Sequence, residues 1–169
     1  MNQYITNRID NIISNGFTIV VGDANGADKS VQKYLNSRNY RNVVVFCVGD
    51  RCRNNEGNWE IRHISADIED TGFNFYAAKD AQMAKEASYG FMIWDAKSSG
   101  TLNNIINILK ENKKVLVYIS SEKCFYTLHN ASELAEILEK CDKISLEKFD
   151  KKLGVTKFLG QEQPRLGFV

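Results

Sequence analysis

The sequence of 169 residues has few prolines, few histidines and no long apolar run. Its single proline, Pro164, indicates a chain built mainly of regular elements joined by short loops. The two histidines, His63 and His129, have no partner at metal-ligand spacing, and Cys47 and Cys52 are too few and too far apart for a structural zinc pattern. We therefore predict no metal site. No apolar run approaches the ~20 residues of a membrane span, so we expect no membrane partner.

The charges are balanced, with 22 basic and 21 acidic residues and a net charge of +1. No broad basic field is available to bind nucleic acid or an anionic membrane. The first residues, MNQYITNRID, lack the charged segment and apolar core of a secretory signal. Four cysteines form no dense framework, so we expect reduced thiols, with Cys47 a small apolar side chain in a buried strand. A cytoplasmic protein is the prediction.

Apolar patterns of helical and extended type alternate along the chain. Hydrophobic residues make up 43% of it, an ordinary globular value. The spacing of apolar residues and the positions of turn-forming and capping residues predict five helices and four strands. The helices are at 2–14, near 31–35, and at 75–87, 102–109 and 131–140, and the strands are at 17–21, 43–48, 91–94 and 115–119. This order predicts an α/β, three-layer Rossmann-like fold with a mainly parallel sheet flanked by helices.

Two segments interrupt this rhythm. Residues 49–70 are polar and long for a connection from strand to helix, where ~2–6 residues is usual. They are a candidate lid or specificity loop, and equally a surface excursion without function. Residues 142–169 read as a small strand, an arm or a tail. We predict a Rossmann-like domain at 1–142 and an extension at 143–169 that packs on it or on a partner subunit.

The stretch 89–119 reads as strand, polar loop, helix and strand, which is a right-handed βαβ unit. In open parallel sheets, ligands bind beyond the carboxyl ends of the strands, where loops enter helices. Small side chains, hydroxyls and free amides at such a helix start suit a phosphate or another anion. The predicted anion-binding residues are Lys97, Ser98, Ser99, Gly100 and Thr101, with Asn104 behind them.

A second candidate lies in the turn after the strand at 17–21. Gly22 and Gly26 permit a tight turn and close approach by a ligand. Asp23 or Asp28 could accept hydrogen bonds from ribose hydroxyls or an amine, beside Asn25; alternatively, Asp28 only caps the following helix. The pattern is not GxGxxG, and no cofactor is predicted.

Two further candidates are Arg53 with Asn54 in the long polar segment, and Lys79 with Asp80 in a helix. Arginine can bind phosphate through two parallel hydrogen bonds, and asparagine can read a base edge or a sugar. The alternatives are a solvated loop and a surface ion pair of little energetic value. All these candidates fall at strand ends or helix starts of the predicted sheet.

The order and spacing of these motifs resemble the SLOG superfamily of Rossmann-like nucleotide-binding proteins, which includes the Lonely Guy cytokinin-activating phosphoribohydrolases. The segments that carry the resemblance are GDANGAD at 22–28, RNN at 53–55, KDAQM at 79–83 and SGT at 99–101. The resemblance covers roughly the central 100 residues. It implies a nucleotide-like small molecule as the ligand.

The chain departs from that family in two ways. Asn104 stands where the phosphoribohydrolases have a glutamate that serves glycosidic cleavage, and a neutral amide cannot act as a general base. The chain also opens in a helix, where family members begin with a strand. Either the sheet is one strand short or another segment, such as 143–169, or another subunit supplies the edge. An open edge favours a homodimer or higher homo-oligomer.

Three functions are compatible with these features. The first is binding or sensing of a nucleotide or nucleotide-derived metabolite. The second is an N-glycosidic hydrolase or a deoxyribosyltransferase-like enzyme acting on nucleoside phosphates, with Asp95 and Asp23 as its catalytic carboxylates. The third is a dimeric interaction protein with a vestigial pocket. A metabolite panel separates the third from the first two.

Overall fold

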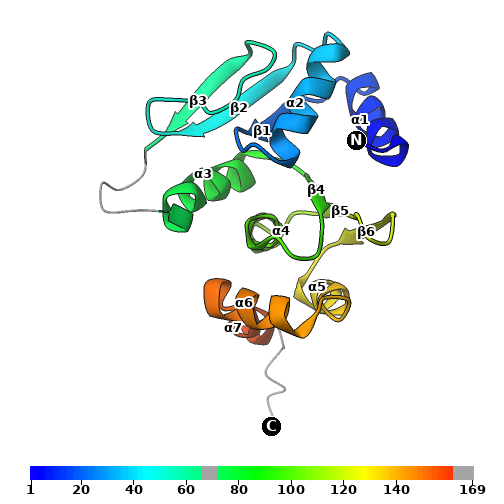
Figure 1. The fold of residues 1–169 in the computed structure, drawn as a ribbon, viewed down its shortest axis with the longest axis vertical. Coiled ribbons are helices and arrows are strands. Elements are labelled where there is room, and N and C mark those ends of the chain that lie inside the picture. Colours follow the sequence, from blue (N-terminus) through cyan, green and yellow to red (C-terminus); the bar gives the residue numbers. More distant parts are fainter. Residues whose placement is uncertain (66–71, 162–169) are drawn as a thin grey trace. The chain divides into compact units, whose positions relative to one another are not determined.

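The computed structural model describes residues 1–65 and 72–161. The chain divides into two compact units, Met1–Ala87 and Ser88–Val169. Each unit contains a three-stranded sheet flanked by helices (Figure 1), which confirms the predicted α/β fold of Rossmann-like type. The expected boundary at 142 differs from this division, which falls between Ala87 and Ser88.

The first unit carries a fully parallel sheet in the order β1-β2-β3. Its elements are α1 (Gln3–Ser14), β1 (Ile19–Gly22), α2 (Ala27–Ser37), β2 (Val43–Val48), β3 (Glu60–Ile64) and α3 (Gly72–Glu86). Helix α3 contacts all three strands. Because parallel strands run in one direction, the carboxyl ends of β1 and β2 share one edge of this sheet.

Central position explains the composition of β2, whose Val45, Phe46 and Cys47 are fully buried. A strand with neighbours on both sides and helices over it reads as a continuous apolar run. Helix α1 begins because the side chain of Asn2 accepts a hydrogen bond from the amide of Ile5, and it buries Ile5 and Ile9. The predicted helices and strands of this unit are therefore present, with shifts of a few residues.

The segment expected to be loop throughout 49–70 contains β3. This strand was missed because only Ile61 and Ile64 are apolar in it and they do not alternate. An edge strand with one neighbour needs little apolar surface, and most of β3 is exposed or half-buried. The loop before it is ordered by the side chain of Asn55, which bonds both the amide and the carbonyl of Trp59. Residues 66–71, the rest of that segment, lie outside the described residues.

The second unit contains the predicted βαβ unit. Its elements are β4 (Gly90–Trp94), α4 (Ser99–Lys110), β5 (Val115–Ile119), β6 (Cys124–Leu128), α5 (Ala131–Leu138), α6 (Lys143–Leu153) and α7 (Val155–Gln161). Strands β4 and β5 are parallel, and β6 pairs antiparallel with β5. Strand β6, which was not predicted from the sequence, therefore forms a hairpin with β5. The turn into β6 uses Lys123 at a positive φ, so no glycine marked it.

Residues 143–161 of the C-terminal segment form the two helices α6 and α7, so this described part does not supply the edge strand considered in the sequence analysis. Asp142 caps α6 by accepting a hydrogen bond from the amide of Ser145, and Gly154 ends it with a φ of +62°. Phe149 is fully buried, 5.9 Å from the ring of Trp94. Residues 143–153 thus belong to the core of the second unit. Residues 162–169 lie outside the described residues.

The expectation of four reduced thiols is wrong for one pair, because Cys47 and Cys52 form a disulfide. The chain reverses at Gly49, with a φ of +69°, and this turn brings the two Cα atoms to 5.2 Å. Cys124 and Cys141 are free. Within residues 1–65 and 72–161, no helix has both the length and the hydropathy to cross a membrane.

Candidate functional site

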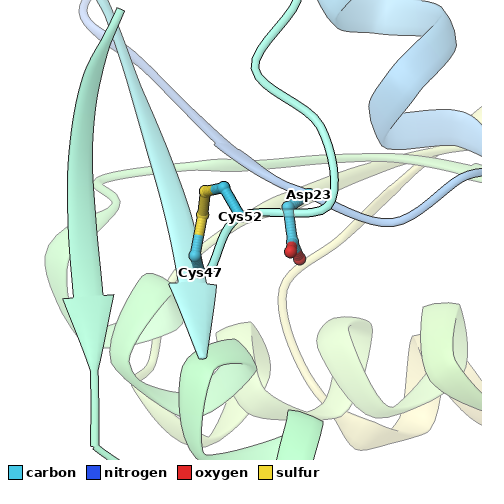
Figure 2. A group of neighbouring side chains, drawn as sticks. All are labelled: Asp23, Cys47 and Cys52. Atoms are coloured by element: carbon cyan, nitrogen blue, oxygen red, sulfur yellow. A yellow bond between two sulfur atoms is a disulfide. The ribbon is translucent and has the colours of Figure 1, made fainter. Parts of the chain in front are cut away.

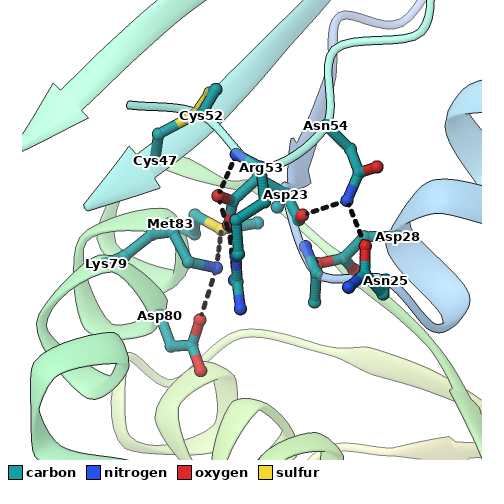
Figure 3. Close-up of polar contacts among 12 residues, drawn as sticks. Asp23, Asn25, Asp28, Cys47, Cys52, Arg53, Asn54, Lys79, Asp80 and Met83 are labelled. Atoms are coloured by element: carbon teal, nitrogen blue, oxygen red, sulfur yellow. Dashed lines mark hydrogen bonds and ion pairs between the residues drawn. A yellow bond between two sulfur atoms is a disulfide. The ribbon is translucent and has the colours of Figure 1, made fainter. Parts of the chain in front are cut away.

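A group of polar side chains lies beyond the carboxyl ends of β1 and β2 in the first unit. Figure 3 shows these side chains converging from four segments: the turn after β1, the first turn of α2, the loop after β2 and helix α3. We call them the polar cluster, and its members are Asp23, Asn25, Asp28, Arg53, Asn54, Lys79 and Asp80. The sequence had indicated each of these residues separately.

Asp23 and Arg53 form the most closely bonded pair in the polar cluster. The carboxylate of Asp23, only 2% exposed, accepts from the backbone amide, Nε and Nη2 of Arg53 at 3.0, 3.1 and 2.7 Å. Burial alone would raise the pKa of Asp23, but the hydrogen bonds and charge of Arg53, aided by Lys79, bring that pKa below its ordinary value. Asp23 is therefore a fixed anion that orients Arg53, which disfavours it as a catalytic base.

Asn54 joins the loop after β2 to the turn after β1. Its side-chain amide donates to the carbonyl of Asp23 at 2.7 Å and to Oδ1 of Asn25 at 2.9 Å. Gln32, fully buried in α2, donates to the carbonyls of Gly22 and Asn54. These bonds fix both loops against each other.

Asp28, Lys79 and Asp80 form the other half of the polar cluster. The ammonium of Lys79, whose side chain is 4% exposed, donates to Asp80 at 2.9 Å. Asp28 accepts from the backbone amide of Ala24, so it closes the turn before α2. Burial raises the pKa values of both Asp28 and Asp80, against the lowering effect of the Lys79 charge. These two carboxyl groups can therefore carry a proton more readily than Asp23 can.

Gly22 is required where the two halves meet. A Cβ atom at this position would overlap Oδ2 of Asp28 and lie 2.8 Å from Nζ of Lys79. The second predicted glycine, Gly26, is the N-cap of α2 and supplies no side-chain cap. The start of α2 therefore has no capping side chain to satisfy its first amides, and such amides attract anions.

Gln32 and Tyr76 contribute to this site and were missed in the sequence, whereas Met83 belongs to the KDAQM segment already noted there. Gln32 is spaced four residues after Asp28 and three before Leu35, so helical periodicity could have placed it on the inward face of α2. Tyr76 lies under the guanidinium of Arg53, 4.2 Å from Cζ to the ring centre, and Met83 places its sulfur 3.9 Å from Nζ of Lys79. No short motif marks Tyr76, because the contact joins distant segments.

The predicted anion loop of the second unit is a separate structure at the start of α4. Asp95 accepts from the backbone amides of Lys97 and Ser98, and Ser98 caps α4 by accepting from the amide of Thr101. Asp95 thus serves as a structural acceptor for loop amides. Gly100 lies in the first turn of the helix.

Buried polar atoms without a partner lie next to this loop. They are Oγ of Ser99, Nδ2 of Asn103 and Oδ1 of Asn104. Ser99 is 4% exposed. Buried polar groups are normally hydrogen-bonded, so these atoms are available to a ligand or water. Asn104 thus keeps an unused acceptor beside the loop.

Asp23, Cys47 and Cys52 also offer a possible metal-ligand group, with one ligand atom from each within 4.8 Å of the others. The residues fit a metal poorly. The carboxylate of Asp23 is already bonded three times by Arg53, and the two sulfur atoms are joined to each other. Thiolate ligands must be free and deprotonated to bind zinc.

Comparison of the chain with family models, with curated proteins and with solved structures finds no match.

Proposed function

We propose that the polar cluster binds the sugar and base of a nucleotide or nucleotide-derived metabolite. The observation that carries the proposal is the gathering of Asp28, Arg53 and Asp80 around Lys79 and Gly22, at the strand ends where α/β folds bind ligands. The resemblance to the SLOG superfamily implies the same class of ligand, and that resemblance remains a prediction.

The chemistry of the polar cluster suits hydroxyl groups. Three carboxylates stand against two cations, so a second anion gains little there, whereas the carboxyl oxygens of Asp28 and Asp80 can accept hydrogen bonds from vicinal ribose hydroxyls. Arg53 stacks on Tyr76, and the exposed third of its side chain adds a flat cationic surface that a base can cover. A sugar with an attached base uses both features.

The start of α4 is a second, separate element for which we propose anion binding. The hydroxyl of Ser99 and Nδ2 of Asn103 are unpartnered buried donors for an anion, and Lys97 adds a positive charge. Oδ1 of Asn104 is an acceptor, so we assign it to a hydroxyl group of the ligand. Two of the loop amides already serve Asp95, so the hydroxyls and Lys97 carry more of this role than the sequence suggested.

A thermal-shift panel on the full chain tests the proposal. It compares adenosine, guanosine, cytidine and uridine with their 5′-monophosphates, with ADP-ribose and with ribose 5-phosphate. A ligand at ~100 times its dissociation constant adds roughly 2.7 kcal/mol of stability. We expect at least one nucleotide to stabilise the wild type, and Asp80→Asn to weaken that effect while Asp50→Asn leaves it unchanged. Failure of every compound would contradict the proposal.

The same panel separates binding from catalysis. An enzyme of N-glycosidic chemistry needs a carboxyl group that exchanges protons, and Asp28 and Asp80, with raised pKa values, are better placed for it than the bonded Asp23. Liquid chromatography of each positive sample decides. Ligand recovered intact supports a binding module, and free base with ribose phosphate supports an enzyme.

We further propose that the chain works as a homo-oligomer in the cytoplasm, as the sequence predicted. Strands β1 and β3 are both sheet edges in the first unit as described, which leaves backbone groups for strand pairing. Light scattering after size-exclusion chromatography measures the mass of the particle. A mass of one chain at all concentrations would contradict the oligomer.

A further inference from the structure

We infer that Cys47 and Cys52 form a reversible dithiol–disulfide pair that fixes the loop carrying Arg53 and Asn54 against Asp23. Figure 2 shows the pair at the end of β2, with the Asp23 side chain next to it. Neither cysteine is among the residues that we propose to contact the ligand. They are the covalent link directly before the two loop residues on which the polar cluster depends.

The fold holds the two cysteines together whether or not the bond is present. Cys47 is fully buried in the central strand β2, which is paired with β1 on one side and β3 on the other. The intervening turn is attached to β3, because the amide of Gly49 donates to the carbonyl of Ile64 at 3.1 Å. The Cα separation of 5.2 Å lies within the range that a disulfide spans.

The position of Cys52 relays its state to the polar cluster. Its neighbour Arg53 uses the backbone amide and the guanidinium on Asp23, and Asn54 reaches the turn after β1. With the bond closed, Cys52 is linked covalently to strand β2, which restricts the positions of the residues after it, Arg53 and Asn54. With the bond open, the loop between Gly49 and Asn54 has only its hydrogen bonds to hold it, and local opening becomes easier.

The difference in exposure between the two cysteines determines which of them reacts first. Cys52 is half-buried and Cys47 fully buried, so an oxidant meets Cys52 first. With oxidised glutathione, the Cys52 thiolate attacks one glutathione sulfur, the glutathione S–S bond breaks and one glutathione thiolate leaves. The Cys47 thiolate then attacks the Cys52 sulfur and displaces the second glutathione. Two protein thiols are oxidised, and one glutathione disulfide is reduced to two thiols.

The other two cysteines serve as internal references. Cys124 is exposed in β6 and free, and Cys141 is free with its pKa raised to about 11 by burial and the nearby charges of Asp142 and Asp95. A thiol with so high a pKa provides little thiolate at neutral pH, so it exchanges slowly. Both are free, whereas Cys47 and Cys52 are bonded to each other.

The first experiment equilibrates the full chain in buffers of graded glutathione ratio and counts disulfides by differential alkylation and mass spectrometry. We expect a single internal link between Cys47 and Cys52 that forms and reverses with the ratio. Cys141 should stay alkylatable, and the exposed Cys124 should form only a mixed disulfide with glutathione. Two outcomes overturn the inference: thiols that stay reduced at every ratio, and zinc retained at one atom per chain that protects both cysteines until a chelator removes it.

The second experiment measures hydrogen exchange of oxidised and reduced chain without ligand. We expect peptides covering residues 49–56 to lose protection on reduction, while peptides from β5 do not change. Cys52→Ser should match the reduced wild type in both buffers, and Cys124→Ser should match the wild type. Equal protection of 49–56 in both redox states would overturn the inference even if the disulfide forms. An effect of redox state on nucleotide affinity rests on the proposed function. The exchange measurement is made without ligand, so its result does not depend on that function.

Discussion

Asp23 and Arg53, which lie thirty residues apart in the chain, are joined by three hydrogen bonds to one buried carboxylate. The bonds come from both the backbone and the side chain of Arg53, so they fix the loop as well as the guanidinium. An aspartate held in this way cannot readily accept a further proton. The relationship assigns Asp23 to the organisation of the site, so our proposal gives the ligand contacts to the carboxyl groups of Asp28 and Asp80.

Replacing Arg53 with lysine tests the energetic value of this pair. The Arg53→Lys variant keeps the charge and the backbone amide but loses the two guanidinium bonds, so we expect the free energy of unfolding to fall by about 1 kcal/mol. The value stays at the low end because the arginine side chain is 35% exposed. Urea denaturation measures it. The control, Arg51→Lys at an exposed position, should leave stability unchanged; equal stability of both variants would contradict the role of Arg53.

The raised pKa of Asp28 predicts a pH dependence. Its folded pKa lies above the ordinary value of about 3.9, so the folded state binds more protons than the unfolded state as pH rises through this range. The stability of the wild type relative to Asp28→Asn should therefore be greatest below about pH 4 and fall as pH increases through the raised pKa. Denaturant midpoints across a pH series measure this difference.

Asp23 should give the opposite dependence, because its folded pKa is lowered. The advantage of the wild type over Asp23→Asn is fully present above the ordinary pKa of about 3.9 and is lost as pH falls through the folded value. If both variants changed in the same direction with pH, the assignment of the two carboxylates would be wrong.

Gly22 should tolerate no side chain. Gly22→Ala places a Cβ against Asp28 and Lys79, and we expect a loss of about 1–3 kcal/mol in the free energy of unfolding together with weaker ligand response. Gly100→Ala is the matched control, because its Cβ would meet only Oγ of Ser98 at 3.9 Å in the first turn of α4. That change should be neutral or stabilise by up to about 1 kcal/mol.

The helix α6 should behave as part of the core. Phe149→Ala removes a fully buried ring packed on Trp94, and we expect a loss of about 3–5 kcal/mol. Ile144→Ala, in the same helix but 80% exposed, should change stability by less than about 0.5 kcal/mol. Thermal unfolding of both variants measures the contrast, and similar melting temperatures would show that residues 143–153 do not contribute to the core.

Local patterns were sufficient for the elements that bury a continuous apolar face. Strand β2 and the unit from β4 to β5 were predicted because each is apolar over its whole length or at helical spacing. Strand β3 and helix α6 were missed because edge strands and half-exposed helices carry weak patterns. Helix α6 begins at the cap formed by Asp142 with Ser145 and ends at Gly154, and these residues are the sequence signals that could have predicted it.

The candidate site was predictable only in part, for a related reason. Residues in tight turns, such as Gly22 to Asp28, are recognisable because their backbone requirements are local. The stack of Arg53 on Tyr76 and the Cys47–Cys52 bond depend on how a loop folds back on the sheet, which no local pattern encodes. The cysteines were assigned as reduced from their number alone, whereas their pairing follows from the turn at Gly49.

The most direct test of the proposed site is an NMR titration of the ¹⁵N-labelled full chain with each of the four nucleoside 5′-monophosphates. It reports which amides sense the ligand, whatever its affinity. We predict that at least one nucleotide shifts the amides of Gly22 to Asp28 together with those of Arg53 and Asn54, and that Asp80→Asn reduces these shifts. If none of the four moves these amides, or if shifts occur only elsewhere in the chain, the polar cluster is a structural network and the proposed function is wrong.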